Sequence, residues 1–138
     1  MRIISGDYKG KKILLPKDKL TRPLKDLTKE SIFNIIKHSK LLDINLENST
    51  ILDLFSGVGS FGLECLSRRS ASVTFLESYN EVLTVLKKNI QNLKQQSSSN
   101  IIEKDVFAEN TLKLLNNKFD IIFMDPPYKE KKLTILLN

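Results

Sequence analysis

The tetrapeptide Asp125-Pro126-Pro127-Tyr128 follows the apolar residues 121–124 and so stands where a buried strand would end. Two consecutive prolines fix φ and remove two backbone donors, which stiffens the loop and leaves its carbonyl groups free. The Asp125 carboxylate and the Pro126 carbonyl could then accept hydrogen bonds from a planar exocyclic amine, while the Tyr128 ring stacks on a flipped nucleobase. Taken alone, the tetrapeptide fits a simple turn that closes a strand equally well.

A glycine-rich loop upstream favours the interpretation of the tetrapeptide as a reaction centre that holds an amine over its interpretation as a simple turn. Gly57, Gly59 and Gly62 have the G-x-G-x-x-G spacing after the strand-like residues 51–54. This spacing predicts a tight turn, close approach of the backbone to a ligand and packing of the next helix on the sheet. Asp53 precedes the first glycine, where a carboxylate would repel a pyrophosphate but attract an ammonium group. The loop, with Phe55 as a further cofactor-binding candidate, therefore fits the methionine part of S-adenosylmethionine.

Two further acids follow β-rich runs. Glu77 lies 20 residues after Gly57, the spacing at which a carboxylate meets ribose hydroxyls, although Glu77 could instead cap the next helix. Asp105 is the expected partner of an adenine amino group, with Val106 lining the ring. The alternative for Asp105 is to cap a helix that carries Leu112.

The predicted elements alternate in the order strand, glycine loop, helix, strand, helix, strand, helix, strand. Such alternation predicts an α/β, Rossmann-like fold with a mostly parallel sheet, helices on both faces and ligands at the carboxyl ends of the strands. The helix predicted over residues 79–95 is clearly amphipathic. The four acids Asp53, Glu77, Asp105 and Asp125 all fall at strand ends, so we expect them on one rim of the sheet.

The N-terminal region is predicted to form a small basic β-hairpin followed by a helix. Residues 2–5 and 12–15 are short apolar runs around a segment with two glycines, which suits a hairpin turn. Asp26 can cap a helix whose apolar residues recur at helical spacing until about residue 38. We therefore divide the chain into a hairpin extension, residues 1–24, and one α/β domain, residues 25–138.

Positive charge is concentrated at the N-terminus. Residues 1–40 hold 11 Lys and Arg against 4 Asp and Glu, whereas residues 41–138 hold 11 against 12. The asymmetry suggests a polyanionic partner whose affinity falls as salt rises. The alternative is a solvated basic face that keeps the protein soluble.

The composition is that of an ordinary globular protein. With 138 residues, of which 41% are hydrophobic and 28% charged, the chain can form one domain with a buried core. The single cysteine, Cys65, excludes an internal disulfide, and we see neither a membrane span of ~20 apolar residues nor a signal peptide. We expect a cytoplasmic protein with no membrane contact and no metal site.

Together these motifs resemble a known family. The glycine loop with Asp53 and the Asp-Pro-Pro-Tyr tetrapeptide resemble class I S-adenosylmethionine-dependent amino-methyltransferases. Over essentially the whole chain, the pattern is similar to the bacterial 16S ribosomal RNA guanine-N2 methyltransferase family (RsmD). The segments that carry this likeness are Arg2-Ile3-Ile4-Ser5-Gly6, Lys9-Gly10-Lys11, Arg22-Pro23, Asp26, Glu30-Ser31-Ile32-Phe33-Asn34 and Asp53-Leu54-Phe55-Ser56-Gly57.

The resemblance implies a methyltransferase core, S-adenosylmethionine as methyl donor and the exocyclic N2 of a guanine in 16S ribosomal RNA as acceptor, within an assembling small ribosomal subunit. It also implies RNA contacts on the basic hairpin, for which the candidates are Arg2, Lys9, Lys11, Lys12 and Arg22. The tetrapeptide itself equally fits a DNA adenine-N6 or cytosine-N4 methyltransferase. A third interpretation is a truncated, non-catalytic remnant that binds S-adenosylmethionine or RNA.

The sequence departs from the family pattern at three points. Leu24 stands where a threonine is usual, and Leu27 where an arginine is usual. The family fold also continues with further strands after the tetrapeptide, so we expect a C-terminally short copy of it. In the implied strand order 3-2-1-4, the strand over residues 119–124 would be an exposed edge, which a second copy of the chain could cover in a homodimer.

Overall fold

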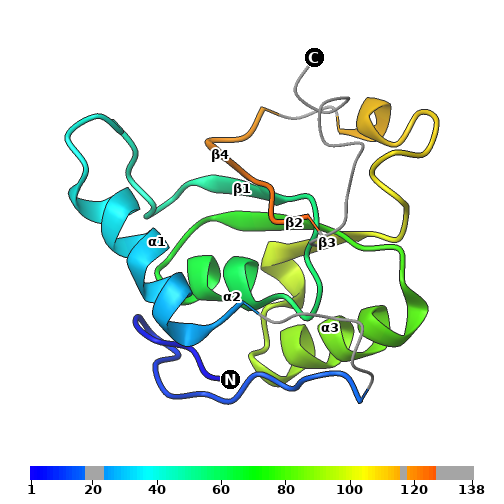
Figure 1. Cartoon of the computed structure of the whole chain (residues 1–138), viewed down its shortest axis with the longest axis horizontal. Coiled ribbons are helices and arrows are strands. Elements are labelled where there is room, and N and C mark those ends of the chain that lie inside the picture. Colours follow the sequence, from blue (N-terminus) through cyan, green and yellow to red (C-terminus); the bar gives the residue numbers. More distant parts are fainter. Residues whose placement is uncertain (18–23, 116–117, 127–138) are drawn as a thin grey trace.

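The computed structural model describes residues 1–17, 24–115 and 118–126, and a parallel four-stranded sheet forms its centre (Figure 1). β1 (Thr50–Asp53) lies between β2 (Ser72–Leu76) and β4 (Ile121–Phe123), and β3 (Ser99–Ile102) pairs with the other edge of β2. The strand order is therefore β3-β2-β1-β4. This confirms the parallel α/β sheet that the alternation of motifs predicts.

The α-helices of the described residues are α1 (Asp26–His38), α2 (Ser60–Ser67) and α3 (Asn80–Asn92), and Figure 1 shows them on one side of the sheet. Alternate strand residues face these helices, because side chains point to opposite faces along a strand. Ile51 and Phe75 accordingly join one buried cluster with Phe33, Phe61 and Leu86 of the helices. This cluster is the main core of the protein.

The opposite face of the sheet is covered differently. Leu52, Leu54 and Leu76 form a second buried cluster with Val106, which lies in the segment after β3. The helix expected to carry Leu112 is only a 3₁₀ turn, η2 (Leu112–Leu114), and its leucines remain exposed. The prediction of an α-helix was wrong here. Asn110 has a left-handed φ of 68°, which interrupts a right-handed helix just before Leu112.

The N-terminal hairpin (residues 1–15) has the predicted antiparallel pairing, but in a reduced form. Arg2 and Lys12 make an isolated antiparallel bridge, and the backbone N–H groups of Ile3 and Ile13 each donate a hydrogen bond of 2.9 Å across the turn. Ile3 and Ile13 are buried in the main core. The hairpin therefore packs tightly on the protein while its basic side chains face solvent.

The first helix begins where the sequence predicts, with a different cap. Lys25 occupies the N-cap position of α1 and makes no side-chain capping hydrogen bond. Asp26 lies in the first turn instead, where its negative charge interacts favourably with the helix dipole. The prediction that Asp26 caps this helix was therefore wrong by one position.

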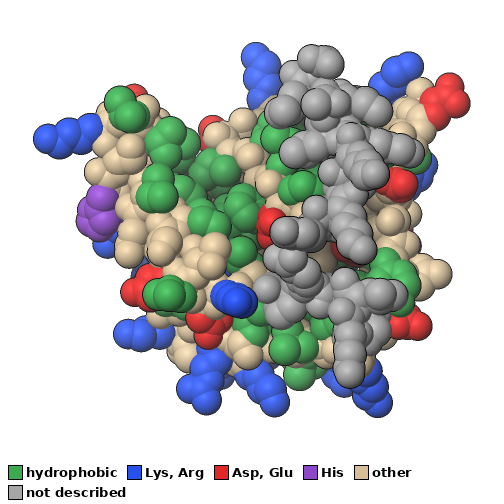
Figure 2. Space-filling model, viewed as in Figure 1, with side chains coloured by type: hydrophobic (Ala, Val, Ile, Leu, Met, Phe, Trp, Pro, Cys, Tyr) green, Lys and Arg blue, Asp and Glu red, His purple; other side chains and the backbone are tan. Residues whose placement is uncertain are grey.

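The surface combines basic side chains with exposed apolar ones. Figure 2 shows Lys and Arg side chains around the lower rim, where the N-terminal hairpin runs, and hydrophobic side chains gathered between α1 and β4. Leu27, Ile35, Leu41 and Ile122 are among the exposed apolar residues. In the part of the chain that the structure describes, every helix is too short or too polar to cross a membrane.

Candidate functional site

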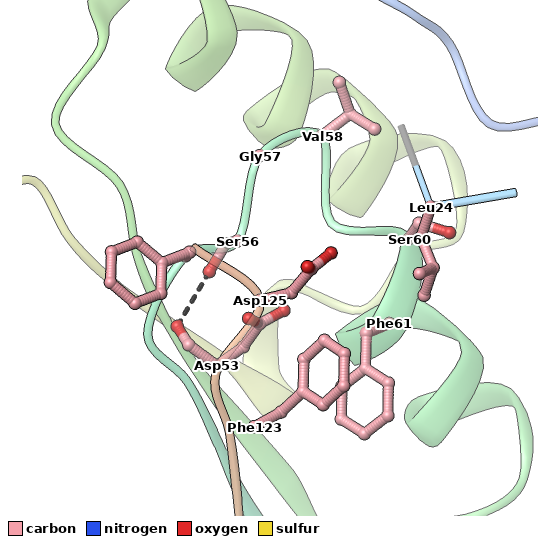
Figure 3. Close-up of a pocket in the computed structure, with 10 residues that line it drawn as sticks. Leu24, Asp53, Ser56, Gly57, Val58, Ser60, Phe61, Phe123 and Asp125 are labelled. Atoms are coloured by element: carbon pink, nitrogen blue, oxygen red, sulfur yellow. Dashed lines mark hydrogen bonds between the residues drawn. The ribbon is translucent and has the colours of Figure 1, made fainter. Parts of the chain in front are cut away.

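A pocket lies at the carboxyl ends of β1 and β4, and we call it the Asp53 pocket (Figure 3). Its walls come from the glycine loop, the start of α2, and residues at the ends of the two strands. The lining residues are Leu24, Asp53, Phe55, Ser56, Gly57, Val58, Ser60, Phe61, Phe123 and Asp125. Asp53 pairs with Phe123 in the parallel register, so Asp125 follows directly beside it.

Asp53 is the buried acid of this pocket. It is only 1% exposed, and its Oδ1 atom has no hydrogen-bond partner among the described residues. Burial raises the pKa of Asp53 to about 8; the backbone N–H of Phe55 opposes this rise, whereas the charges of Asp125 and Glu77 add to it. A buried carboxylate without a counter-charge is costly, so the pocket favours a ligand that brings a positive group to Asp53.

The backbone of the glycine loop requires glycine where it turns. Gly57 and Gly59 have φ values of 54° and 92°, in the left-handed region that side chains disfavour. A Cβ atom on Gly59 would lie 2.6 Å from Leu86 Cδ1 of α3, so there is also no space for a side chain. The tight turn predicted from the glycine spacing is therefore confirmed.

The third glycine of the motif has a packing role. Gly62 lies inside α2, and a Cβ atom there would come within 2.8 Å of Val73 Cγ1 and closer still to the Phe75 ring. Glycine therefore lets α2 approach the sheet, as the spacing predicts. Gly59 and Gly62 are absent from the pocket lining, although both were predicted to bind the cofactor.

Glu77 connects the glycine loop to the start of α3. Its Oε1 atom accepts a hydrogen bond of 3.0 Å from Gly57 N, and its Oε2 atom accepts bonds of 3.1 Å from Ser78 N and 3.4 Å from Tyr79 N. Tyr79 is the N-cap residue of α3. These bonds reach the glycine loop and the two residues before α3 but no N–H group of the helix itself, so they do not show the helix-capping alternative. The ribose contact of Glu77 stays a prediction.

Asp105 and Val106 do not line the Asp53 pocket. Asp105 Oδ1 accepts a bond of 3.0 Å from Phe107 N, and the Asp105 carbonyl accepts one of 2.8 Å from Thr111 Oγ1, so this residue closes a turn rather than capping an α-helix. Val106 is buried against the sheet. The segment nevertheless reaches the pocket wall, because the Phe107 and Phe55 ring centroids are 6.0 Å apart.

Asp125 and Pro126 are described, whereas Pro127 and Tyr128 lie outside the described residues. Asp125 is exposed and lines the pocket, and Pro126 is half-buried. Figure 3 shows the Asp125 side chain next to Asp53, between the glycine loop and two phenylalanine rings. The structure therefore brings two of the predicted rim acids into one pocket.

The two phenylalanine rings were missed by sequence reasoning. Phe61 of α2 and Phe123 of β4 stack with their centroids 3.8 Å apart and form an apolar wall of the pocket. Phe123 could have been found from the strand register, since it pairs with Asp53. Ser56, Val58 and Ser60 were also missed, although they alternate with the glycines of the motif.

The Asp53 pocket has a volume of about 50 Å³. Small-molecule sites usually measure ~300–1,000 Å³, so this pocket accounts only for the part of a ligand that reaches Asp53. A larger, shallow hollow of about 540 Å³ lies on α1 and is lined by Asn34, Ile35, His38 and Ser39. It contains no carboxylate, so the smaller pocket is the better candidate for chemistry. Across the described ranges, we find no group of three or more potential ligands that could hold a metal ion.

The predicted RNA-contacting residues that the structure describes lie outside the lining of the Asp53 pocket. Arg2, Lys9, Lys11 and Lys12 are exposed on the N-terminal hairpin, whereas Arg22 lies outside the described residues. These four exposed side chains do not line the Asp53 pocket. A polyanion at the hairpin and a small ligand at Asp53 would therefore occupy different places.

Comparison with known proteins places this architecture in a family. The family model described as "Conserved hypothetical protein 95" matches residues 1–138. The chain belongs to this family. One similar protein, "Ribosomal RNA small subunit methyltransferase D" of Haemophilus influenzae, is 36% identical over 133 residues, which cover 93% of this chain and 64% of the relative. The protein of the same name in Escherichia coli is 31% identical over 141 residues, covering 100% of this chain and 65% of the relative.

A solved structure supports the same family assignment. "Putative methyltransferase yhhF" from Escherichia coli superposes with a TM-score of 0.72 at 29% identity and covers 94% of this chain and 65% of the other. The resemblance to the RsmD family inferred from the motifs is thus confirmed. The chain spans about two thirds of the length of these relatives.

Proposed function

We propose that this chain carries the catalytic site of an S-adenosylmethionine-dependent methyltransferase that modifies an exocyclic amine in small-subunit ribosomal RNA. The observation that carries the proposal is the placement of Asp53 and Asp125, from adjacent parallel strands, in one pocket with the glycine loop. The RNA substrate is supported by the names of the two relatives, which are ribosomal RNA small subunit methyltransferases. The choice of guanine N2 in 16S ribosomal RNA comes from the motif resemblance.

The residues of the Asp53 pocket suit a positively charged methyl donor. The buried Oδ1 atom of Asp53, which has no hydrogen-bond partner among the described residues, can receive an ammonium group, and Gly57 allows close approach because it has no side chain. Phe55 and Phe61 supply apolar surface beside it. Glu77 is the candidate for the ribose hydroxyls. When bound, S-adenosylmethionine supplies an electrophilic methyl group.

Asp125 and Pro126 are proposed to hold the acceptor. The Asp125 carboxylate and the Pro126 carbonyl would accept hydrogen bonds from a base amine and so direct its nitrogen lone pair toward the pocket. Because a sulfonium methyl is already activated, this orientation can contribute several kcal/mol without strong acid–base catalysis. Stacking of the base on Tyr128 and stiffening of the loop by Pro127 remain predictions.

The deciding experiment measures transfer of a tritium-labelled methyl group to small ribosomal subunits that lack the modification, followed by base analysis. Label on guanine N2 supports the proposal. Label on adenine or cytosine of duplex DNA, in a parallel reaction, would assign the chain to the DNA methyltransferases instead. Donor binding by calorimetry without any transfer would indicate a non-catalytic binding protein.

A variant at Asp125 tests its assigned role. Asp125→Ala should abolish methyl transfer while leaving donor affinity nearly unchanged, because Asp125 is proposed to orient the acceptor amine. Asp43→Ala, which removes an exposed carboxylate outside the pocket lining, is the matched control and should retain transfer. Equal loss of donor binding and transfer in Asp125→Ala would contradict the assignment of Asp125 to the acceptor.

A further inference from the structure

A buried asparagine joins the N-terminal hairpin to the glycine loop. Asn89 of α3 is 2% exposed, and its Nδ2 atom donates hydrogen bonds of 3.1 Å to Leu14 O and 2.9 Å to Val58 O. Its Oδ1 atom accepts a bond of 2.8 Å from Leu14 N. Leu14 belongs to the hairpin, and Val58 lines the Asp53 pocket. Moving either segment alone would leave buried polar groups unpaired, which is costly.

A second buried side chain makes a parallel connection from α1. Lys29 is fully buried, and its Nζ atom donates hydrogen bonds of 2.9 Å to Arg2 O and 3.3 Å to Ser60 Oγ. The same ammonium group pairs with Glu64 Oε1 at 3.3 Å. Ser60 also lines the Asp53 pocket. The two ends of the hairpin are thus linked to the residues on either side of Gly59.

Other contacts hold the hairpin without touching the glycine loop. Ser67 Oγ, at the far end of α2, donates a bond of 2.6 Å to Ser5 O and accepts one of 3.0 Å from Tyr8 N. Glu64 accepts a bond of 3.0 Å from Ser5 N. These bonds end on α2 and attach the hairpin there. The bond from Asn89 to Val58 is therefore not needed to keep the hairpin in place.

We propose that Asn89 is a positioning residue that couples polyanion binding on the hairpin to the shape of the Asp53 pocket, with Lys29 acting in the same direction through Ser60. This inference rests on the proposed function, in which the hairpin contacts RNA and the pocket holds the methyl donor. RNA that fixes Leu14 also fixes Val58 through Asn89. By thermodynamic linkage, RNA and donor then tighten each other's binding by the same factor.

The test is calorimetric titration of the whole chain with S-adenosylmethionine, with and without saturating small-subunit ribosomal RNA. In the wild type, RNA should tighten donor binding by about five-fold or more. In Asn89→Ala, the ratio of the donor affinities measured with and without RNA should fall to nearly one. Ser67→Ala is the matched control, because it removes buried hairpin bonds that do not reach the loop, and it should keep the wild-type ratio.

Two further measurements secure the result against misfolding. Asn89→Asp keeps the acceptor for Leu14 N and nearly the same volume but loses the Nδ2 donor to both Leu14 O and Val58 O. It is the second variant to use if Asn89→Ala does not fold, and RNA should change its donor affinity little. In the wild type, hydrogen–deuterium exchange of residues 57–60 should slow when RNA is added, and unchanged exchange overturns the inference without any variant.

The possible failures are distinguishable. The coupling is overturned if folded Asn89→Ala or Asn89→Asp keeps the wild-type ratio of donor affinities with and without RNA. It is also overturned if the wild type binds RNA and donor separately but shows a ratio of one. The proposed function survives these two outcomes. A wild type that does not bind the donor at all overturns the proposed function, and the inference with it.

Discussion

Replacing the buried acid of the pocket should change how the stability of the protein depends on pH. Asp53→Asn keeps the shape of the side chain and removes its titration. Asp53 has an ordinary pKa of 3.8 when unfolded and a pKa of about 8 in the folded protein, because burial disfavours its charge. Between these two values the folded chain holds a proton that the unfolded chain has released, so stability should fall as pH rises.

The size of the effect follows from the two pKa values. Within the window between them, each pH unit should remove about 1.4 kcal/mol of stability. From pH 5 to pH 7 the wild type should therefore lose about 3 kcal/mol through Asp53 alone. Asp53→Asn lacks this contribution, and its stability curve should be flatter than that of the wild type by the same amount.

Urea unfolding followed by circular dichroism at pH 5, 6 and 7 measures this difference. The other titrating groups are shared by both proteins, so only the difference between their slopes reports on Asp53. Asp43→Asn, which removes an exposed carboxylate, should follow the wild-type slope. Parallel stability curves for the wild type and Asp53→Asn would refute the claim that this carboxyl is neutral and uncompensated in the folded protein.

Three other predictions concern stability and association. Gly59→Ala should destabilise the protein to urea more than Gly10→Ala, because both have left-handed φ values but a Cβ atom meets open space only at position 10. Glu64→Gln should cost about 3–5 kcal/mol of unfolding free energy, since it leaves the buried Lys29 uncompensated, whereas Asp7→Asn in the exposed ion pair with Arg69 should cost far less. If a second copy covers the β4 edge, analytical ultracentrifugation should detect a dimer that Ile122→Lys dissociates; a monomeric wild type would disprove this proposed homodimer.

The sequence predicted the sheet well, because alternating motifs constrain which strands run in parallel. The same alternation could not say which rim acids meet. Asp53 and Asp125 share the pocket since β1 and β4 are neighbours, and Glu77, which follows β2, reaches the loop at Gly57. Asp105 follows β3, at the edge of the sheet and two strands from β1, and forms its own turn.

Long-range contacts explain what sequence reasoning missed. Lys29 is a residue type that is ordinarily expected in solvent, yet it is fully buried and pairs with Glu64 of α2. Asn89 shows no local signal either, since its partners come from the hairpin and the glycine loop. Such residues are specified by the assembled fold and not by the spacing of neighbours along the chain.

These contacts also show what supports the glycine loop beside Asp53. Glu77 bonds to Gly57, Asn89 to Val58 and Lys29 to Ser60, so side chains from three parts of the chain support the loop. A loop fixed in this way does not need Asp53 for its own stability. Among the described residues, Asp53 Oδ1 has no hydrogen-bond partner, so a positively charged ligand can bind there.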